Sequence, residues 1–550
     1  MRALLLSASL CLLGLLSACQ VTPVPKDYGE LATRIGAGET VSVADLQLAL
    51  EHAPDIGERF KQLQDLEEQA LALMVDEPLK LGAIGTAILD AYYGSLAGHM
   101  AMIKFYEHVS SDDAAIPHRE WQQRIIEHID KTDGSADAAF HVTGRAEAHA
   151  HQLYRKLETV GGIYQSDERN PLTIALIGNR EGEAVTTSFY ALAPMYAAMR
   201  ARFPTEPENE ESATLAIIGI LARESDGAAQ TSVGAFLAAR KRTEGAIGWL
   251  RAASRDGNIV ANMLLAGIFR DQIRDAENDQ AREAYKTEIL DNYMHAIALG
   301  STDAMYALAV LYLNEQFGKD NVQAGVPLLE RAAALKHSDS LTYLGHLYSQ
   351  GLHVKEDPGK AAASFVQAGE LGNPRASYAY ARMLMSESNT IEPDLRIFTW
   401  LEKLADADET EAMLHLGNLN ARGIGTRVNA GRALRWYKAA IKANPKDGNV
   451  INEIAWTVTV SDIKGLSQPR YARTIMDTLM ETDEEARQRP EYLDTWAAIH
   501  AANGEFDRAV ELQQEALKRA TAEKRDDVLE ILNTHLKMFQ AGEVIIERAP

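Results

Sequence analysis

The sequence predicts an all-α fold in which helical hairpins stack into an α-solenoid. Side chains of matching size recur every 36 residues through the middle of the 550-residue chain. Within each repeat, the recurring side chains lie four positions apart, which places them on one face of a helix. Glycine and an Asn-Pro pair stand where such helices would end and begin.

The first helix of each repeat is marked by a small residue, a large residue four positions later, and a second small residue beside it. This pattern predicts a buried stripe along which neighbouring helices approach closely. It occurs four times without slippage, at Ala304, Leu308 and Ala309, at Ser340, Leu344 and Gly345, at Ala376, Tyr380 and Ala381, and at Ala412, Leu416 and Gly417.

The second helix of each repeat keeps the same register. Its columns are Leu328, Ser364, Trp400 and Trp436, followed four residues later by Ala332, Ala368, Leu404 and Ala440. A spacing of 43 residues links Asn292 to Trp249, which indicates an earlier repeat with about seven extra residues between 268 and 284. Because residues locked to a packing period are usually buried, Trp249, Trp400 and Trp436 are expected in the core and not as sugar-stacking platforms.

The expected helix ends carry capping residues. Gly300 and Gly372 stand just after a second helix, where a C′ glycine adopts a left-handed conformation. Asn373 and Pro374 are an N-cap and N1 pair for the helix that follows. These residues predict where two of the helix boundaries fall.

The repeat columns resemble the Sel1-like subfamily of tetratricopeptide repeats. The matching residues are Leu416-Gly417, Gly423-Ile424-Gly425 and Ala433 through Ala440, and a second set at Leu344-Gly345, Tyr348, Gly351, Asp357 and Lys360 through Ala362. The resemblance covers 212–445. The repeat that starts at Ala376 lacks the loop glycines between Ser386 and Thr390, so it departs from the pattern.

The C-terminal region, 446–550, is similar to ordinary tetratricopeptide units. The run from Tyr492 to Ala509, with Gly504 at the expected inter-helix turn, continues into Ala516-Leu517. The stretch 452–456 after Pro445 resembles a first helix of the same class. The segment from Thr521 onward is expected to form the cap that a solenoid needs for solubility.

The N-terminal region, 46–203, is helix-rich in composition but shows no clean period. It is expected to be helical, and degenerate repeats are one interpretation: 81–106 has the length of two helices, with Gly94 and Gly98 in the connection. The segment 204–211 is acidic and contains two prolines, which predicts an exposed linker before the repeat array.

The first residues indicate export. Arg2 precedes an apolar run, 3–16, of about 14 residues, which is shorter than the ~20 that span a bilayer as a helix. Residues 1–18 are therefore expected to be a signal peptide. The run ends in Leu16-Ser17-Ala18-Cys19, which resembles the lipobox of bacterial lipoproteins. An ordinary secretory signal with an incidental cysteine is the alternative.

The lipobox resemblance implies that Cys19 is the lipidated residue, acylated with groups such as palmitate. Because Pro23, Pro25 and Gly29 follow it, 19–45 is expected to form a tether. Gln20 follows the cysteine, where an aspartate would resemble an inner-membrane retention signal. In a Gram-negative host, the resemblance therefore implies a lipid anchor in the outer membrane, with the protein facing the periplasm.

Composition narrows the class of partner. The formal net charge of −23 disfavours nucleic acid and anionic lipid surfaces, because both are negative. The two cysteines, Cys11 and Cys19, both lie at the start of the chain, so the folded body has neither a disulfide framework nor a thiolate metal site.

Few motifs suggest catalysis, and neither a cofactor nor a metal is expected. Gly423 and Gly425 form a G-x-G pattern near a helix start, but no third glycine follows at the required place, so a turn is expected. The densest histidine patch is His141, Glu147, His149 and His151. The favoured interpretation is solvated or hydrogen-bonded surface histidines, and a metal site is the alternative.

These observations favour a non-enzymatic scaffold that binds other envelope proteins along the groove-facing side of the first helices. The candidate contact residues vary between repeats while the packing columns do not: Tyr306, Val310, Thr342, His346, Tyr378, Arg382, Leu414 and Asn418. Two alternatives stay open. One is an accessory subunit for assembly or export of an envelope polysaccharide, since lipid-anchored Sel1-like proteins of alginate secretion look broadly similar. The other is a metalloenzyme with its site in 46–203.

Overall fold

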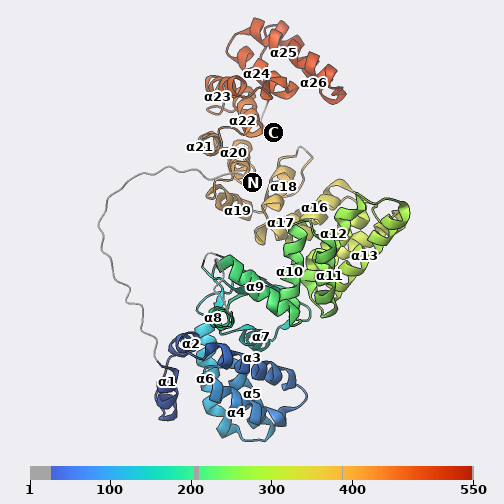
Figure 1. Cartoon of the computed structure of the whole chain (residues 1–550). Helices are drawn as coiled ribbons and strands as arrows, with labels where there is room; N and C mark the ends of the chain where they lie inside the picture. Colours follow the sequence, from blue (N-terminus) through green and yellow to red (C-terminus); the bar gives the residue numbers. More distant parts are fainter. Residues whose placement is uncertain (1–26, 168, 204–209, 387, 548–550) are drawn as a thin grey trace. The chain divides into compact units, whose positions relative to one another are not determined.

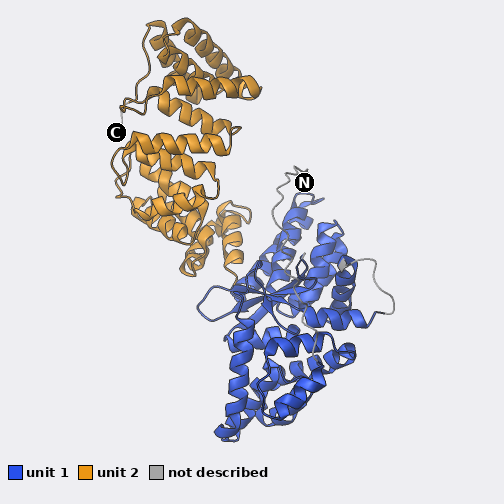
Figure 2. Ribbon diagram, turned by 90° about the vertical axis from the view of Figure 1, so that its left-hand side faces the viewer, with its two compact units in different colours: residues 1–300 blue, residues 301–550 orange. Residues whose placement is uncertain are grey.

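The computed structural model describes residues 27–167, 169–203, 210–386 and 388–547, and these fold into two compact units (Figures 1 and 2). Unit 1 extends to Gly300, and unit 2 begins at Ser301. The described part of the chain contains 26 α-helices, which confirms the mostly helical class. The predicted signal peptide, Cys19 and nearly all of the 204–211 linker lie outside the described residues. The predicted tether, 19–45, is described from residue 27 onward, and there the prediction is wrong: Tyr28–Gly36 is a helix, and Leu31 and Val41 are buried in the core of unit 1.

Unit 1 combines thirteen described helices with one sheet. Several helices begin at side-chain N-caps, as where Ser95 accepts a hydrogen bond from the Gly98 amide. The helices are α1 (Tyr28–Gly36), α2 (Val43–Glu51), α3 (Ile56–Leu73), α4 (Leu81–Ala91), α5 (Leu96–His108), α6 (Asp112–Ile129), α7 (Arg145–Tyr154), α8 (Ala193–Ala201), α9 (Glu210–Arg223), α10 (Gly227–Ala239), α11 (Thr243–Arg255), α12 (Ile259–Ile273) and α13 (Asp279–Ala298).

The sheet corrects the expectation that 46–203 is helical throughout. Its strands are β1 (Phe140–His141), β2 (Glu158–Gln165), β3 (Thr173–Asn179) and β4 (Thr186–Ala191), in the order β1-β4-β3-β2. Only β1 and β4 are parallel. The strands escaped notice because β3 is a short buried apolar run, which periodicity alone does not distinguish from a buried helix segment.

The outer edge of β2 is covered by helices of the predicted repeat array. Ser232 of α10 accepts a hydrogen bond from the Tyr164 amide (2.8 Å) and donates one to the Tyr164 carbonyl (3.1 Å). Asn258, the N-cap of α12, donates to the Gly162 carbonyl (2.8 Å). These contacts satisfy backbone groups at an edge strand and join α10 and α12 to the sheet. The boundary between the units therefore falls at Gly300, inside the predicted 212–445 array.

Two helices do occupy 81–106, as expected. Gly94 lies in the connection between α4 and α5, but Gly98 lies inside α5. A Cβ at Gly98 would come within 2.7 Å of the Ile88 side chain, so this glycine permits close packing of the two helices. Among the described residues, no helix has the length and apolarity needed to cross a membrane.

Unit 2 consists of helical hairpins, drawn in orange in Figure 2. In each hairpin the first helix packs against the second, and α26 follows the last pair. The helices are α14 (Thr302–Leu313), α15 (Gly325–Ala334), α16 (Ser338–Gln350), α17 (Pro358–Glu370), α18 (Pro374–Met385), α19 (Arg396–Ala405), α20 (Thr410–Arg422), α21 (Ala430–Ala443), α22 (Gly448–Val460), α23 (Pro469–Thr482), α24 (Pro490–Ala502), α25 (Phe506–Ala522) and α26 (Asp526–Gln540).

The buried seam of the second helices lies one residue beyond the predicted tryptophan column. Trp249, Trp400 and Trp436 are only half-buried, at the border of the core, so their assignment to the core is right only in part. The next position along the chain is buried throughout, and recurs every 36 residues from unit 1 into unit 2 as Tyr293, Leu329, Phe365, Leu401 and Tyr437. These large side chains fill the seam together with small buried residues of the same helices, such as Ala332, Ala368 and Ala440.

The predicted caps are confirmed. Gly300 and Gly372 adopt φ of +95° and +81° just after α13 and α17. The Asn373 side chain accepts hydrogen bonds from two backbone amides at the start of α18, at 3.0 and 3.3 Å. Gly423 and Gly425 are also left-handed, with φ of +72° and +68°, and form the expected turn.

The loop that lacks the repeat glycines is held by side chains instead. After α18, Asn389 accepts a hydrogen bond from the Ile391 amide (3.1 Å) and donates one to its carbonyl (3.0 Å). The Tyr380 hydroxyl accepts from the Asp394 amide (2.8 Å). The repeat at 376 therefore completes its hairpin with α19 by a different local chemistry.

Candidate binding groove on unit 2

The candidate contact residues share one face of α14, α16, α18 and α20. We call them the first-helix row: Tyr306, Val310, Thr342, His346, Tyr378, Arg382, Leu414 and Asn418. Their spacing of four places two members on the same side of each helix. Arg382 is exposed, Tyr306, Val310 and His346 are half-buried, and the other four are buried by the neighbouring helices.

At the start of the row, Tyr306 of α14 contacts α16. Its ring centroid lies 5.5 Å from that of His337 and 6.2 Å from that of Tyr343. His337 caps α16 by accepting the Ser340 amide at Nδ1 (3.2 Å), so its Nε2 carries the proton that is donated to Asp303 (3.0 Å). That hydrogen bond lowers the pKa of Asp303. These contacts fix the Tyr306 ring in place.

In the middle of the row, α18 and α20 are joined by charge. Arg382 donates to Glu411 (2.9 Å), and His415 Nε2 lies 3.6 Å from the same carboxylate. The interaction with His415, followed by that with Arg382, lowers the pKa of Glu411. The Tyr378 ring lies tilted against the His415 ring, with 5.6 Å between the centroids, and burial raises the pKa of Tyr378 to about 12.

Asn418 is engaged by the fold itself. Its Oδ1 accepts a hydrogen bond from the Tyr437 hydroxyl (2.7 Å), and its Nδ2 donates to Glu453 of α22 (2.8 Å). The amide therefore has a partner on each side and positions the Glu453 carboxylate. Glu453, which the sequence interpretation did not single out, is exposed on the same face.

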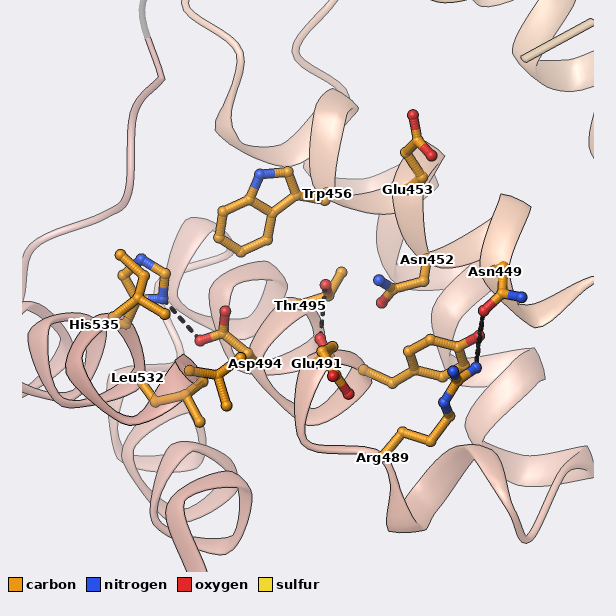
Figure 3. Close-up of a pocket in the computed structure, with 13 residues that line it drawn as sticks. Asn449, Asn452, Glu453, Trp456, Arg489, Glu491, Asp494, Thr495, Leu532 and His535 are labelled. Carbon is orange, nitrogen blue, oxygen red and sulfur yellow. Dashed lines mark hydrogen bonds and ion pairs between the residues drawn. The ribbon is translucent and has the colours of Figure 1, made fainter. Parts of the chain in front are cut away.

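The same face continues into a pocket that the sequence interpretation missed. We call it the C-terminal pocket; it has a volume of about 540 Å³ and is formed by α22, α24 and α26 (Figure 3). The predicted row stopped at Asn418, although extending the same helix face into 446–550 would have reached Asn452 and Trp456. The lining residues are Asn449, Asn452, Glu453, Trp456, Arg489, Glu491, Tyr492, Asp494, Thr495, Val528, Ile531, Leu532 and His535.

One end of the C-terminal pocket is built on a buried carboxylate and imidazole. Asp494 Oδ1 accepts hydrogen bonds from Gln513 (2.7 Å) and from Nδ1 of His535 (2.8 Å). The His535 ring centroid lies 5.6 Å from that of Trp456. Trp456 Nε1 donates to Glu547 in the segment after α26 (3.0 Å).

The other end of the pocket contains Arg489. Its guanidinium donates to Asn449 (2.8 Å) and to the Tyr492 hydroxyl (2.7 Å), and it stacks over the Tyr492 ring at 4.6 Å. Glu491 nearby pairs with Arg525 of the loop before α26 (2.8 Å). The pocket is therefore polar at both ends, with an aromatic and aliphatic wall between them.

The histidine patch of unit 1 does not converge on one site. His141 is exposed, whereas Glu147 is buried and accepts from the amide and hydroxyl of Thr143 (2.7 and 2.9 Å). His151 is fully buried between Tyr190 (3.1 Å) and Asp130 (3.2 Å), which corrects the surface assignment for this residue. In the part of the chain that is described, no three His, Cys, Asp or Glu side chains are arranged to hold a metal ion.

His149 instead lines a separate pocket of about 670 Å³ in unit 1. Arg145 lies at its centre and pairs with Glu68 and Asp226, both at 2.6 Å. Burial lowers the pKa of His149, so the neutral imidazole is favoured. The pocket gives unit 1 a polar cleft between α7, β2 and the start of α10.

Comparison with known proteins identifies Sel1 repeats at 302–337, 338–373 and 410–445. The intervening repeat, which lacks the loop glycines, is not among these matches. No curated protein matches the chain.

Three solved structures are similar to the chain. One is a protective antigen of uropathogenic Escherichia coli strains that displays an SLR fold. It is 14% identical to this chain, the matched region spans 62% of this chain and 70% of the antigen, and the TM-score is 0.44. A Sel1 repeat protein from Oxalobacter formigenes is 21% identical over 39% of this chain and 85% of its own, with a TM-score of 0.29. A tetratricopeptide repeat protein from Parabacteroides merdae is 16% identical over 59% of this chain and 98% of its own, with a TM-score of 0.25.

Proposed function

We propose that this Sel1-repeat chain is a non-enzymatic scaffold that binds a partner protein along the first-helix row and the C-terminal pocket. The observation that carries the proposal is the continuity of this face within unit 2. Contacts join α14 to α16, α18 to α20 and α20 to α22, as between Tyr306 and Tyr343, Arg382 and Glu411, and Asn418 and Glu453. Such a preorganised, extended surface suits recognition by many side chains.

Charge supports a partner with a basic surface. The chain has a formal net charge of −23, which favours association with proteins of opposite charge. Glu453 and Glu411 lie on the proposed surface, and Glu411 is kept ionised by its neighbours. A basic partner would approach faster at low ionic strength.

The location of the scaffold belongs to the proposal as well. We infer anchoring at the outer membrane through lipid on Cys19, facing the periplasm, and the partner is then another envelope protein. The support is the residue pattern around Cys19. A role as an accessory subunit of a polysaccharide assembly or export system stays a prediction.

The scaffold is tested by site-specific photo-crosslinking in cells, with the crosslinker at Arg382 or at Lys403. Both residues are exposed and belong to the same repeat, but Arg382 lies on the first helix and Lys403 on the second. We expect one identified partner to be crosslinked from position 382 and not from 403. With that partner purified, Arg382→Trp should weaken binding at least 10-fold because the bulky ring obstructs the contact face, whereas Lys403→Trp should leave binding unchanged. Equal effects at the two positions would refute the proposal.

A further inference from the structure

The C-terminal pocket contains two buried polar side chains whose outer atoms have no partner among the described residues. Asp494 is 9% exposed and His535 is 5% exposed. Their mutual hydrogen bond uses Asp494 Oδ1 and His535 Nδ1. Figure 3 shows the second carboxylate oxygen of Asp494 directed toward the space beneath Trp456. These two atoms are open to the pocket, and Oδ1 of Asn452, which also lines it, is buried without a partner among the described residues. The pocket therefore offers unpaired polar atoms to a ligand.

The free oxygen of Asp494 is an acceptor in the ionised carboxylate, and Nε2 of His535 is an acceptor when the imidazole is neutral. An ionised carboxylate only accepts hydrogen bonds, so Nδ1 of His535 carries the proton that is donated to Asp494. In the neutral imidazole, Nε2 then has a lone pair. The ligand group must therefore supply hydrogen-bond donors, as an ammonium or a guanidinium group does.

The charge around the pocket favours the same class of ligand. Glu453 and Glu491 line the pocket together with Asp494, and Arg489, the one lining cation, is bound to Asn449 and Tyr492 at the opposite end. A carboxylate or phosphate placed beside Asp494 would face like charges within a few ångströms. A positive group is attracted there.

The wall of the pocket suits a long aliphatic stem. Trp456 and Leu532 lie beside Asp494, and Ile531 leaves 50% of its surface exposed. Methylene groups of a lysine or arginine side chain pack well on such surfaces, and the cation is stabilised by the face of an indole. The exposed isoleucine gains burial when the stem is bound.

We propose that this pocket receives one lysine or arginine side chain from the partner protein, with its charged end at Asp494 and His535 and its stem against Trp456, while Glu453 adds negative charge at the rim. The inference rests on the proposed function, because it names the chemistry by which the scaffold recognises its partner. It also defines a specificity site, since shorter or acidic side chains do not reach the acceptors or are repelled by them.

The test uses the full chain in detergent and four small probes: the N-acetyl methylamides of lysine, arginine, norleucine and glutamate. Binding is measured by ligand-observed NMR. We expect millimolar binding of the lysine and arginine probes, at least 10-fold weaker binding of norleucine, and none of glutamate. Equal binding of lysine and norleucine, or tighter binding of glutamate, overturns the inference.

Two variants locate the binding. Asp494→Asn keeps the shape of the side chain and should weaken the lysine probe at least 10-fold. Glu453→Gln should weaken binding of the lysine probe about 3-fold. Because Glu453 is exposed and tolerates substitution, this variant tests the inference even when Asp494→Asn fails to fold. Asp507→Asn on α25 removes the same charge outside the pocket and should have no effect. Unchanged affinity in both pocket variants overturns the inference.

The alternative occupant to test is a basic side chain of the same chain, and Arg548 follows Glu547 in the sequence. A rise of 10-fold or more in probe affinity for Arg548→Ala would assign the pocket to this terminus and overturn the partner assignment. The crosslinking experiment tests the proposed function independently of the pocket. If a partner is crosslinked from position 382 but Asp494→Asn does not change its affinity, the scaffold function is supported and only the inference about the pocket is overturned.

Discussion

Glu67 and Glu147 are two ionisable residues whose carboxyl groups are buried inside unit 1. Glu67 is buried and accepts a hydrogen bond from Ser95 (2.5 Å). Burial, with the nearby Glu147 carboxyl adding to it, raises the pKa of Glu67 to about 8. Burial also raises the pKa of Glu147, although hydrogen bonds from Thr143 oppose the shift. Both carboxyl groups accept hydrogen bonds from neighbouring segments, while burial favours their neutral form.

The raised pKa of Glu67 predicts that unit 1 loses stability as pH rises. The folded state binds a proton more tightly than the unfolded chain, so the contribution is complete below pH ~4.5 and is lost as pH rises to about 8. Glu67→Gln, which stays neutral, should flatten this dependence and raise the free energy of unfolding at pH 8 by roughly 3 kcal/mol relative to wild type. Urea denaturation at pH 5.5 and pH 8 measures the difference.

Glu120→Gln serves as the control for this prediction, since Glu120 is exposed on α6. It should leave the pH dependence as in the wild type. If Glu67→Gln retains the full wild-type loss of stability between the two pH values, the burial of an ionisable Glu67 is not its cause.

Among the helices and their contacts, the repeating small residues explain how the hairpins close. A Cβ at Gly345 would come within 2.5 Å of the Phe365 ring, and one at Gly417 within 2.2 Å of the Tyr437 ring. In these two hairpins the large aromatic side chain of the second helix therefore rests on a bare backbone in the first helix. This complementarity explains why small and large residues alternate with the repeat.

Gly417→Ala is expected to destabilise unit 2 by about 1–3 kcal/mol, because the added methyl group displaces the Tyr437 ring and disturbs its hydrogen bond to Asn418. Gly267→Ala on α12 is the matched control, since nothing lies within 4 Å of the added Cβ. There the higher helix propensity of alanine should stabilise by roughly 0.5–1 kcal/mol. Denaturant titration of both variants measures the contrast, and equal effects would argue against close packing at Gly417.

For the whole molecule, the proposed scaffold combines a sheet-containing unit 1 with a unit 2 of helical hairpins. Unit 2 supplies the proposed partner surface, and unit 1 contains the 670 Å³ cleft. The predicted anchor at Cys19 would keep both units beside a membrane without a spanning helix.

Cys19→Ser is expected to abolish incorporation of labelled palmitate and to move the protein from the membrane fraction to the soluble fraction, because two or more acyl chains are needed for stable anchoring. Cys11→Ser, within the apolar run, should keep both the label and the membrane association. Palmitate labelling with membrane fractionation provides the measurement. Undiminished labelling of Cys19→Ser would rule out lipidation at this residue.

By itself, the sequence determined the hairpin repeats, their register, and the caps at Gly300, Gly372 and Asn373. It could do so because each repeat buries its side chains against its neighbour, and the environment of one residue recurs 36 residues later. The tertiary structure alone decided the sheet at 140–191 and the C-terminal pocket. Both depend on residues far apart in the sequence: the pocket brings together Trp456, Asp494 and His535 from three helices, and no local period records such contacts.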